Sequence, residues 1–292
     1  LLISWLDFLG SPIRASFLYF TFLQKDLGAW SPWSYFCRLK QDIKQVLYRE
    51  INYRRQNYDP ERSDILTLLL SARDENNQGL TDEELHDEVL GLLIAGHEIT
   101  AAAMTWGLYW IHHQPHVGEK LLAELNNLGD LQDPVSISQL AYLTAVCQET
   151  LRIYPTAIAA SARVVNSPVD LNGYKLEPGT MVMPCTYLVH HRQDLYFNSH
   201  QFLPERFLER QFSPYEYLPF GGGNRRCIGA ALSMFEMKLV LATIISKYQL
   251  DMVSKQPIKP QYQGFLLAPT GGVKMRIINQ RQPAKPLAKL RG

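Results

Sequence analysis

The chain has 292 residues and a hydrophobic content of 46%, which is enough to bury a large core and lies near the upper size of one domain. Its 29 basic and 28 acidic side chains leave a net charge of +1, so no general attraction to nucleic acid or to an anionic membrane surface is expected. Its 15 Tyr, 12 Phe and 5 Trp exclude a disordered protein, and its four cysteines lack disulfide-framework or zinc-ligand spacing. A reducing, cytoplasmic location fits this composition best.

The two ends of the chain differ in character. The first eight residues are apolar and read as the middle of a helix, but Asp7, Gly10 and Pro12 interrupt the run too early for it to cross a bilayer. We therefore expect no transmembrane segment, and we interpret the beginning as a point inside a larger protein. Residues 281–292 are basic and contain proline, which predicts a loose tail.

Helical periodicity dominates the first two thirds of the chain. The predicted helices cover residues 34–56, 63–73, 81–115 and 138–154, and the last of them is expected to begin at Ser138 as its N-cap and to end at Pro155. Thr81 and Glu84 have the spacing of a capping box at the start of the third helix. At about 1.5 Å per residue that helix would be about 50 Å long, enough to cross a whole domain.

The pattern then becomes strand-like. Residues 169–171 and 174–176 flank Asn172-Gly173, which predicts a hairpin with a tight turn. A final amphipathic helix is predicted from near Cys227 to about Tyr248. Further short strands are expected at residues 161–165, 181–187, 250–252, 265–267 and 273–277. The predicted fold class is therefore mainly α with small β-sheets.

A glycine-rich segment precedes the last helix and contains Cys227. Its sequence, Phe220-Gly-Gly-Gly-Asn-Arg-Arg-Cys-Ile-Gly229, would let the backbone approach a flat ligand closely. The positive end of the helix and the adjacent Arg225 and Arg226 favour a thiolate over a thiol. A phosphate-binding loop is the alternative, but neither Gly-Lys-Ser/Thr nor G-x-G-x-x-G spacing is present. An ordinary turn with a buried cysteine is the other alternative for this loop by itself.

The full pattern F-x-x-G-x-R-x-C-x-G resembles the haem-binding loop of the cytochrome P450 family, and of its bacterial members in particular. The resemblance implies haem b as cofactor, with Cys227 as the iron ligand. It also implies that Arg225 contacts a haem propionate and that Phe220 packs near the sulfur. It covers residues 1–280 as a partial cytochrome P450 domain truncated at the N-terminus, in which the substrate-roof helices come first.

Two further motifs occur in the order that this family has them. Glu149 and Arg152 are three residues apart in an apolar helix, so the pair is expected to be buried and to need further partners. The resemblance supplies Arg206, from the segment Phe202-Leu-Pro-Glu-Arg-Phe207, as the third member of a structural triad. It also implies that Arg163 binds a propionate, although an edge-strand arginine is the alternative. His191 is a weaker candidate for a binding role.

The long predicted helix contains Ala95-Gly-His-Glu-Ile-Thr100. Gly96 in mid-helix costs roughly 1 kcal/mol against alanine, which suits a place where a large group lies against the backbone. In the family this motif carries an acid and a threonine that organise water and deliver protons. Glu98 matches the acid, but Ile99 stands at the usual threonine position and only Thr100 follows it. An isoleucine side chain can neither donate nor accept a hydrogen bond.

The resemblance implies an oxidoreductase that acts on paired donors and inserts one oxygen atom of O2 into a hydrophobic small molecule. Electrons would come from a ferredoxin- or flavodoxin-type partner or from a reductase, and Arg225, Arg226 and Lys238 are candidates to meet its acidic surface. Because of Ile99, a haem-thiolate peroxygenase or isomerase remains an alternative. A catalytically inactive fragment that only binds haem is the third possibility.

Overall fold

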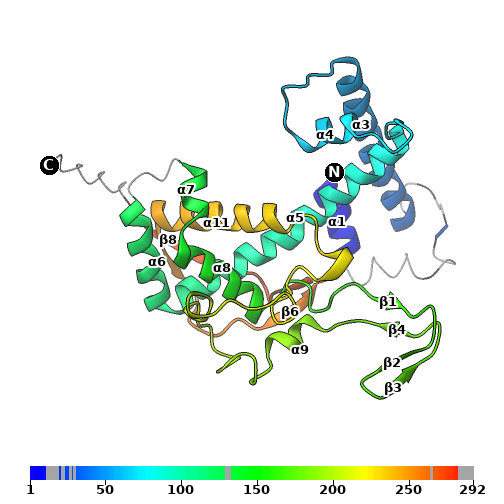
Figure 1. Ribbon diagram of the computed structural model, residues 1–292. Coiled ribbons are helices and arrows are strands. Elements are labelled where there is room, and N and C mark those ends of the chain that lie inside the picture. The colour runs from blue at the N-terminus through cyan, green and yellow to red at the C-terminus, as the bar shows by residue number, and fades with distance from the viewer. Residues whose placement is uncertain are drawn as a thin grey trace. The chain divides into compact units, whose positions relative to one another are not determined.

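The computed structural model describes residues 1–10, 20, 24–25, 28, 31–128, 133–263 and 266–281. By their contacts, these residues belong to two compact units, unit 1 from Leu1 to Glu98 and unit 2 from Ile99 onward (Figure 1). The predicted tail falls almost entirely outside the described residues, which end at Arg281. Each unit has its own hydrophobic core and is described separately.

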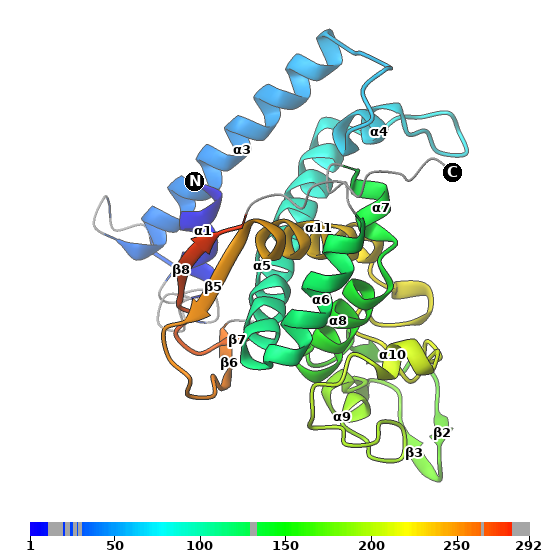
Figure 2. The same cartoon turned by 90° about the vertical axis from the view of Figure 1, so that its left-hand side faces the viewer.

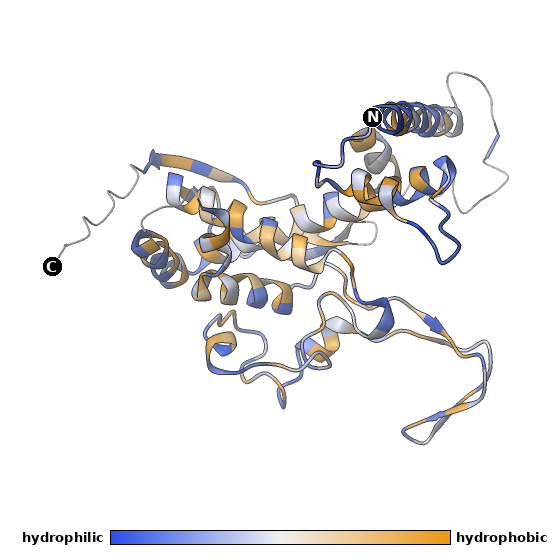
Figure 3. Ribbon diagram, turned by 45° about the horizontal axis from the view of Figure 1, so that its top comes forward, coloured by the Kyte–Doolittle hydropathy of each residue, from blue (hydrophilic) through white to orange (hydrophobic). Residues whose placement is uncertain are grey.

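Unit 1 consists of helices α1 (Leu2–Gly10), α3 (Pro32–Gln56) and α4 (Ile65–Ser71) and the first part of α5 (Asp82–His113). The predicted capping box is confirmed, because the Thr81 amide donates to Glu84 Oε2 at 2.8 Å and the Glu84 amide donates to Thr81 Oγ1 at 3.2 Å. The long helix α3 carries both hydrophilic (blue) and hydrophobic (orange) residues in Figure 3, as expected for a surface helix that buries one face.

Unit 2 has a helical core. The end of α5 joins α6 (Pro115–Leu128), α8 (Ala141–Ile153) and α11 (Ala230–Lys247), which lie close together in Figures 1 and 2. Trp106, Leu121, Leu143, Val146 and Leu241 are among the side chains buried in this core. Helix α8 is the most buried of the four helices, so it provides a rigid base for any polar group that it carries.

Four antiparallel two-stranded sheets accompany these helices within the described residues. They pair β1 (Arg163–Val164) with β4 (Met181–Val182), β2 (Val169–Leu171) with β3 (Tyr174–Leu176), β5 (Tyr248–Met252) with β8 (Met275–Gln280), and β6 (Pro260–Gln263) with β7 (Leu266–Pro269). The β2–β3 hairpin confirms the predicted Asn-Gly turn, with Asn172 at φ 52° and Gly173 at φ 86°. The predicted fold class, mainly α with small sheets, is confirmed.

The helix start predicted at Ser138 is wrong. Ser138 is not an N-cap, because it ends the short helix α7 (Pro134–Ser138) and α8 begins at Ala141. The first amides of α8 are instead capped from another helix, since Glu124 of α6 accepts hydrogen bonds from Tyr142 N at 2.7 Å and Leu143 N at 2.8 Å. A cap that comes from another helix leaves no local sequence signal.

The predicted strand at residues 181–187 is also mostly wrong. Only Met181–Val182 is strand, and the apolar run that follows forms helix α9 (Thr186–His190). A short apolar run of this kind fits a strand and a helix equally well by pattern alone. The final helix begins three residues later than predicted, at Ala230, and a 3-10 turn, η2 (Gly223–Arg225), precedes Cys227.

Helix α5 has the length and the apolar composition that a membrane-crossing helix needs, and it is the one helix of the described segments with both. Core helices of globular proteins share this property. The expectation that the chain has no transmembrane segment therefore stays a prediction.

The cap between α6 and α8 predicts a cost for Glu124→Ala. Loss of an N-cap acceptor costs about 1–2 kcal/mol, and here two amides of a buried helix lose their acceptor at once. Urea unfolding measures this loss. Glu119→Ala, an exposed position on the same helix, is the control and is expected to leave the midpoint nearly unchanged. Equal midpoints for the two variants would refute the role of this cap.

Candidate functional site

The side chains of Glu149 and Arg152 form an ion pair inside unit 2. Both have no exposed side-chain surface, and Arg152 Nε and Nη2 donate to Glu149 Oε2 and Oε1 at 2.6 and 2.8 Å. The spacing of three residues places both side chains on one face of α8. The pair is therefore bidentate and buried, as expected from the apolar sequence around it.

Arg206, from α10 (Arg206–Glu209), reaches the same carboxylate. Its Nε lies 3.2 Å from Glu149 Oε1, which also accepts the amide of Leu203 at 2.8 Å. The structure thus brings together the three residues of the predicted triad. Two guanidinium groups and one backbone amide face a single buried carboxylate, so the extra positive charge needs further acceptors.

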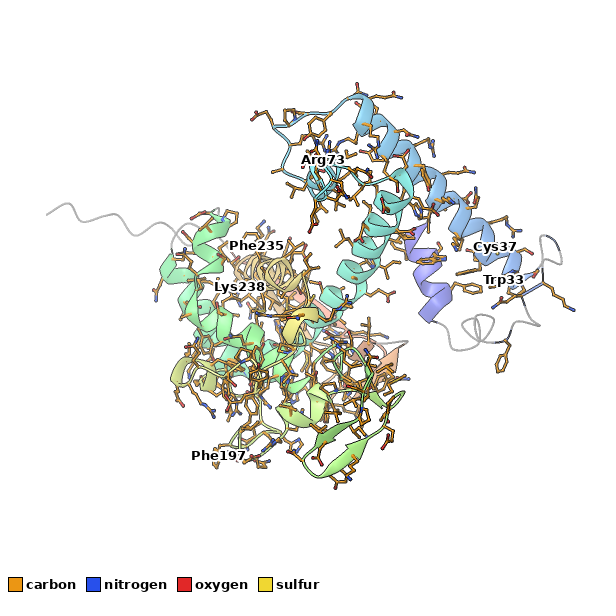
Figure 4. All side chains as sticks on the ribbon, turned by 45° about the vertical axis from the view of Figure 1, so that its right-hand side comes forward. Trp33, Cys37, Arg73, Phe197, Phe235 and Lys238 are labelled. Carbon is orange, nitrogen blue, oxygen red and sulfur yellow. The ribbon has the colours of Figure 1, made fainter. Side chains whose placement is uncertain are left out.

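Backbone carbonyls supply these acceptors. Arg152 Nη1 donates to the carbonyl oxygens of His190 and Ser199 at 2.8 and 2.7 Å, and its Nη2 donates to that of Gln201 at 3.1 Å. Arg206 Nη1 donates to the carbonyl of Phe197 at 2.9 Å. The ring of Phe197 is exposed and lies at the outer edge of the ribbon in Figure 4. The triad therefore fixes the irregular segment 190–201 to helix α8.

His190 is a site residue that the sequence analysis missed in favour of its neighbour His191. Its side chain is fully buried, with Nδ1 3.1 Å from the carbonyl oxygen of Arg152 and Nε2 accepting the amide of Leu218 at 3.0 Å. Burial, with a smaller contribution from the charge of Arg152, lowers the pKa of His190 to about 3, although the hydrogen bond to the Arg152 carbonyl opposes this shift. His191 instead stacks on Tyr187 at 4.0 Å. The two histidines differ in burial and in the partners of their rings, and neither difference can be read from two neighbouring positions in the sequence.

The cysteine loop lies at the start of α11. The amide of Cys227 donates to the carbonyl of Phe220 at 2.9 Å, which closes the loop on itself. Gly221 and Gly223 have φ of 68° and 64°, a conformation that side chains rarely adopt, and a Cβ placed at Gly223 would meet no atom within 4 Å. Cys227 is exposed, whereas Phe220 packs against the helical core.

The surroundings of Cys227 fit a haem group by charge and by exposure. Ile228 beside it is 90% exposed, so its apolar side chain is available to a ligand. Arg225 and Arg163 are exposed, and within the described ranges neither forms an ion pair; Arg163 Nη1 donates only to carbonyls of its own segment, at 2.9 and 3.0 Å. A Cβ at Gly221 would lie 3.9 Å from Ala160, so the loop adjoins the segment that leads to Arg163. Two exposed guanidinium groups without an ion-pair partner among the described residues suit the two propionates of haem.

The predicted residues of the long helix fall in both units. Thr100 is buried in unit 2, and its Oγ1 lies 3.3 Å from Ser233 Oγ of α11. Ile99 is exposed. Gly96 and Glu98 belong to unit 1, and a Cβ placed at Gly96 would meet no atom within 4 Å. The hydroxyl of Thr100 is therefore engaged in packing between helices, while the side chain exposed beside it is the isoleucine.

Comparison with known proteins identifies a family. The cytochrome P450 family model matches residues 7–275. "Putative cytochrome P450 135B1" of Mycobacterium tuberculosis is 35% identical over 246 residues, which are 84% of this chain and 51% of that protein. Cyclooctatin synthase of Streptomyces melanosporofaciens is 32% identical over 232 residues, 77% of this chain and 50% of that protein. The chain thus spans about half the length of the curated relatives it matches.

Solved structures agree with the sequence relatives. The retinoic-acid-bound cyanobacterial CYP120A1 matches 95% of this chain and 63% of its own, with a TM-score of 0.81 and 27% identity. The crystal structure of the cytochrome P450 CYP102L1 matches 82% of this chain and 56% of its own, with a TM-score of 0.74 and 26% identity. The fold of the described residues is therefore that of these proteins.

The buried ion pair predicts a large effect of Arg152→Leu. This change leaves the carboxylate of Glu149 buried without its bidentate partner, which is expected to cost about 3–5 kcal/mol of unfolding free energy. The control is Arg192→Leu, which breaks the exposed pair with Asp194 and is expected to change the urea midpoint little. Similar midpoints for both variants would show that the pair does not hold unit 2 together.

Proposed function

Because the chain belongs to the cytochrome P450 family, we propose that it acts as a haem-thiolate monooxygenase, which inserts one oxygen atom of O2 into a hydrophobic organic substrate. The observation that carries the proposal is the exposed Cys227 at the end of a glycine loop. Leu218, in the segment before the loop, is hydrogen-bonded to His190 next to the buried ion pair. That segment is therefore fixed, while the thiol itself is exposed. A surface cysteine on an ordinary turn would not need such support.

In this proposal haem b is held by residues of unit 2. Cys227 is the iron ligand, Arg225 and Arg163 bind the propionates, and Phe220 covers the sulfur from the core side. When haem is bound, the thiolate of Cys227 would supply electron density to the iron, which favours cleavage of an O–O bond. The bare glycine backbone lets a flat group approach the sulfur without steric conflict.

The residues of α5 provide the polar groups for proton delivery in the same proposal. Glu98 offers a carboxylate that can hold and release a proton, and Gly96 leaves room against the helix backbone. Thr100 Oγ1 can pass a proton only if it exchanges its contact with Ser233 for water. Ile99 excludes water from its own position, because its side chain carries no polar atom.

For partners, we propose an apolar substrate and an acidic electron donor of the ferredoxin, flavodoxin or reductase type. The retinoic acid in one matching structure supports an apolar substrate. Arg225 and Arg226 are exposed and suit an acidic surface. Lys238 suits it less well, because its Nζ donates to the carbonyl of Ser138 at 2.7 Å; Figure 4 labels it on α11. A cytoplasmic location remains part of this proposal.

The first test is the spectrum of the haem-loaded protein. In the reduced carbon-monoxide complex we expect the band of a thiolate-bound haem, and Cys227→Ser is expected to abolish it because a hydroxyl is a poor donor to iron. Cys37→Ser is the matched control, because Cys37 is also exposed but belongs to unit 1, and this change should leave the band intact. A chain that takes up haem without this band would overturn the proposal.

A second candidate function is a haem-thiolate peroxygenase or isomerase. It is favoured by the exposed Ile99 and by the packing of Thr100 against Ser233, which leave no free hydroxyl at this part of α5. A peroxide brings both oxygen atoms with it and needs no proton relay for O2.

The two candidates differ in their oxidant. The peroxygenase turns over a test substrate with hydroperoxide and without an electron donor, and Ile99→Thr is expected to shift activity toward O2 with a reductase. Val182→Thr, on β4, is a control for the added hydroxyl. Turnover of wild type with O2 and a reductase alone would reject the second candidate, and no turnover with either oxidant would indicate a passive haem binder.

A further inference from the structure

His190 lies between the buried charge network and the cysteine loop. On one side its ring Nδ1 is 3.1 Å from the carbonyl oxygen of Arg152, at the end of α8. On the other side its ring Nε2 accepts the amide of Leu218, nine residues before the cysteine, at 3.0 Å. A single side chain therefore connects the ion-pair helix with the segment that leads to Cys227.

The connection to Arg152 runs in both directions. The guanidinium of Arg152 donates to the His190 carbonyl at 2.8 Å, while the imidazole of His190 reaches the Arg152 carbonyl. Both side chains are fully buried, so neither bond competes with water. Any rotation of the imidazole would break one of these bonds, and the ring is therefore held in one orientation.

The protonation state of the ring follows from the same contacts. Because Nε2 accepts an N–H bond, it carries no proton, so Nδ1 carries the proton and donates it to the Arg152 carbonyl. Burial and the neighbouring Arg152 charge, with the pKa lowered to about 3, keep the ring neutral at physiological pH. One tautomer is therefore selected by the fold.

Backbone hydrogen bonds connect Leu218 with the cysteine loop. The amide of Gly221 donates to the Leu218 carbonyl at 3.0 Å, and the amide of Cys227 donates to the Phe220 carbonyl at 2.9 Å. The neighbouring Tyr217 stacks on the His190 ring at 5.5 Å. His190 thus fixes Leu218, and the two backbone hydrogen bonds connect Leu218 with the glycine loop that ends at Cys227.

We propose that His190 is a positioning residue, whose neutral imidazole transmits the fixed geometry of the Glu149–Arg152 pair to the cysteine loop and thereby orients the Cys227 sulfur toward the haem iron. The part of this proposal that concerns iron rests on the proposed function. The part that concerns the loop does not, because the hydrogen bonds belong to the chain itself.

Two polar variants separate the two bonds of the ring. His190→Gln keeps a carbonyl oxygen near the position of Nε2, so it can still accept the Leu218 amide. His190→Asn has a side chain one carbon shorter, so it keeps a donor near Nδ1 for Arg152 and loses the acceptor for Leu218. Both variants keep a polar group in the buried position, which favours folding in each case.

The first measurement is amide hydrogen exchange at Leu218 and Cys227 in the purified protein. His190→Asn is expected to exchange both amides roughly five- to tenfold faster than wild type, the effect of one lost hydrogen bond. His190→Gln is expected to stay near wild type, because it keeps the acceptor for Leu218 and Arg152 Nη1 still donates to the carbonyl of residue 190. His112→Asn is the control, because that ring is partly buried and its Nδ1 bonds the Leu108 carbonyl of its own helix, at 2.7 Å. Unchanged exchange in His190→Asn would overturn the proposal.

The second measurement is the reduced carbon-monoxide spectrum of the haem-loaded variants. His190→Asn is expected to lose a substantial share of the thiolate band to the form with a neutral thiol, with recovery in His190→Gln and no change in His112→Asn. If wild type itself lacks the thiolate band, the proposed function fails and the exchange data still decide the role of His190 in the loop. If the band is equal in all variants although exchange differs, His190 holds the loop but does not orient the sulfur, and the proposal is overturned.

Discussion

The carboxylate of Glu149 has no exposed surface, and a buried charge of this kind is tolerated only when it is neutralised and fully hydrogen-bonded. Arg152, Arg206 and the Leu203 amide meet this requirement together. Because two guanidinium groups carry more donors than one carboxylate accepts, the remaining donors bind carbonyls of the segment 190–201. The need to satisfy one buried charge thus determines where a long irregular segment runs.

Such an arrangement is a poor way to gain stability, because the desolvation cost of buried ions offsets most of their attraction. What the ion pair contributes is a fixed geometry. Charge-assisted hydrogen bonds depend on angle, so they hold the backbone in one position, whereas apolar packing alone would allow it to shift. His190 extends that order to Leu218 and so toward Cys227. The thiol of Cys227 is then exposed while the segment before it is held by hydrogen bonds.

Helix α5 brings a different constraint. Its polar residue Thr100 points into the packing against α11, whereas the exposed position next to it is apolar. A helix of 3.6 residues per turn turns adjacent side chains by about 100 degrees, so a hydroxyl at 100 cannot replace one at 99 without a water in between. The sequence of the cysteine loop matches the family pattern at every fixed position, whereas Ile99 departs from it. The choice between the two proposed reactions therefore depends on Ile99.

The sequence by itself determined the mainly helical fold, the capping box at Thr81 and the Asn-Gly hairpin, because each follows from neighbouring residues and their local geometry. It also determined the family, since the motifs around Glu149, Arg206 and Cys227 keep their order and spacing. Only the tertiary structure decided that Glu124 caps α8, that Thr100 packs on Ser233, and that His190 rather than His191 meets the loop. These contacts join residues far apart in the chain, and their energies depend on burial, which no local pattern contains.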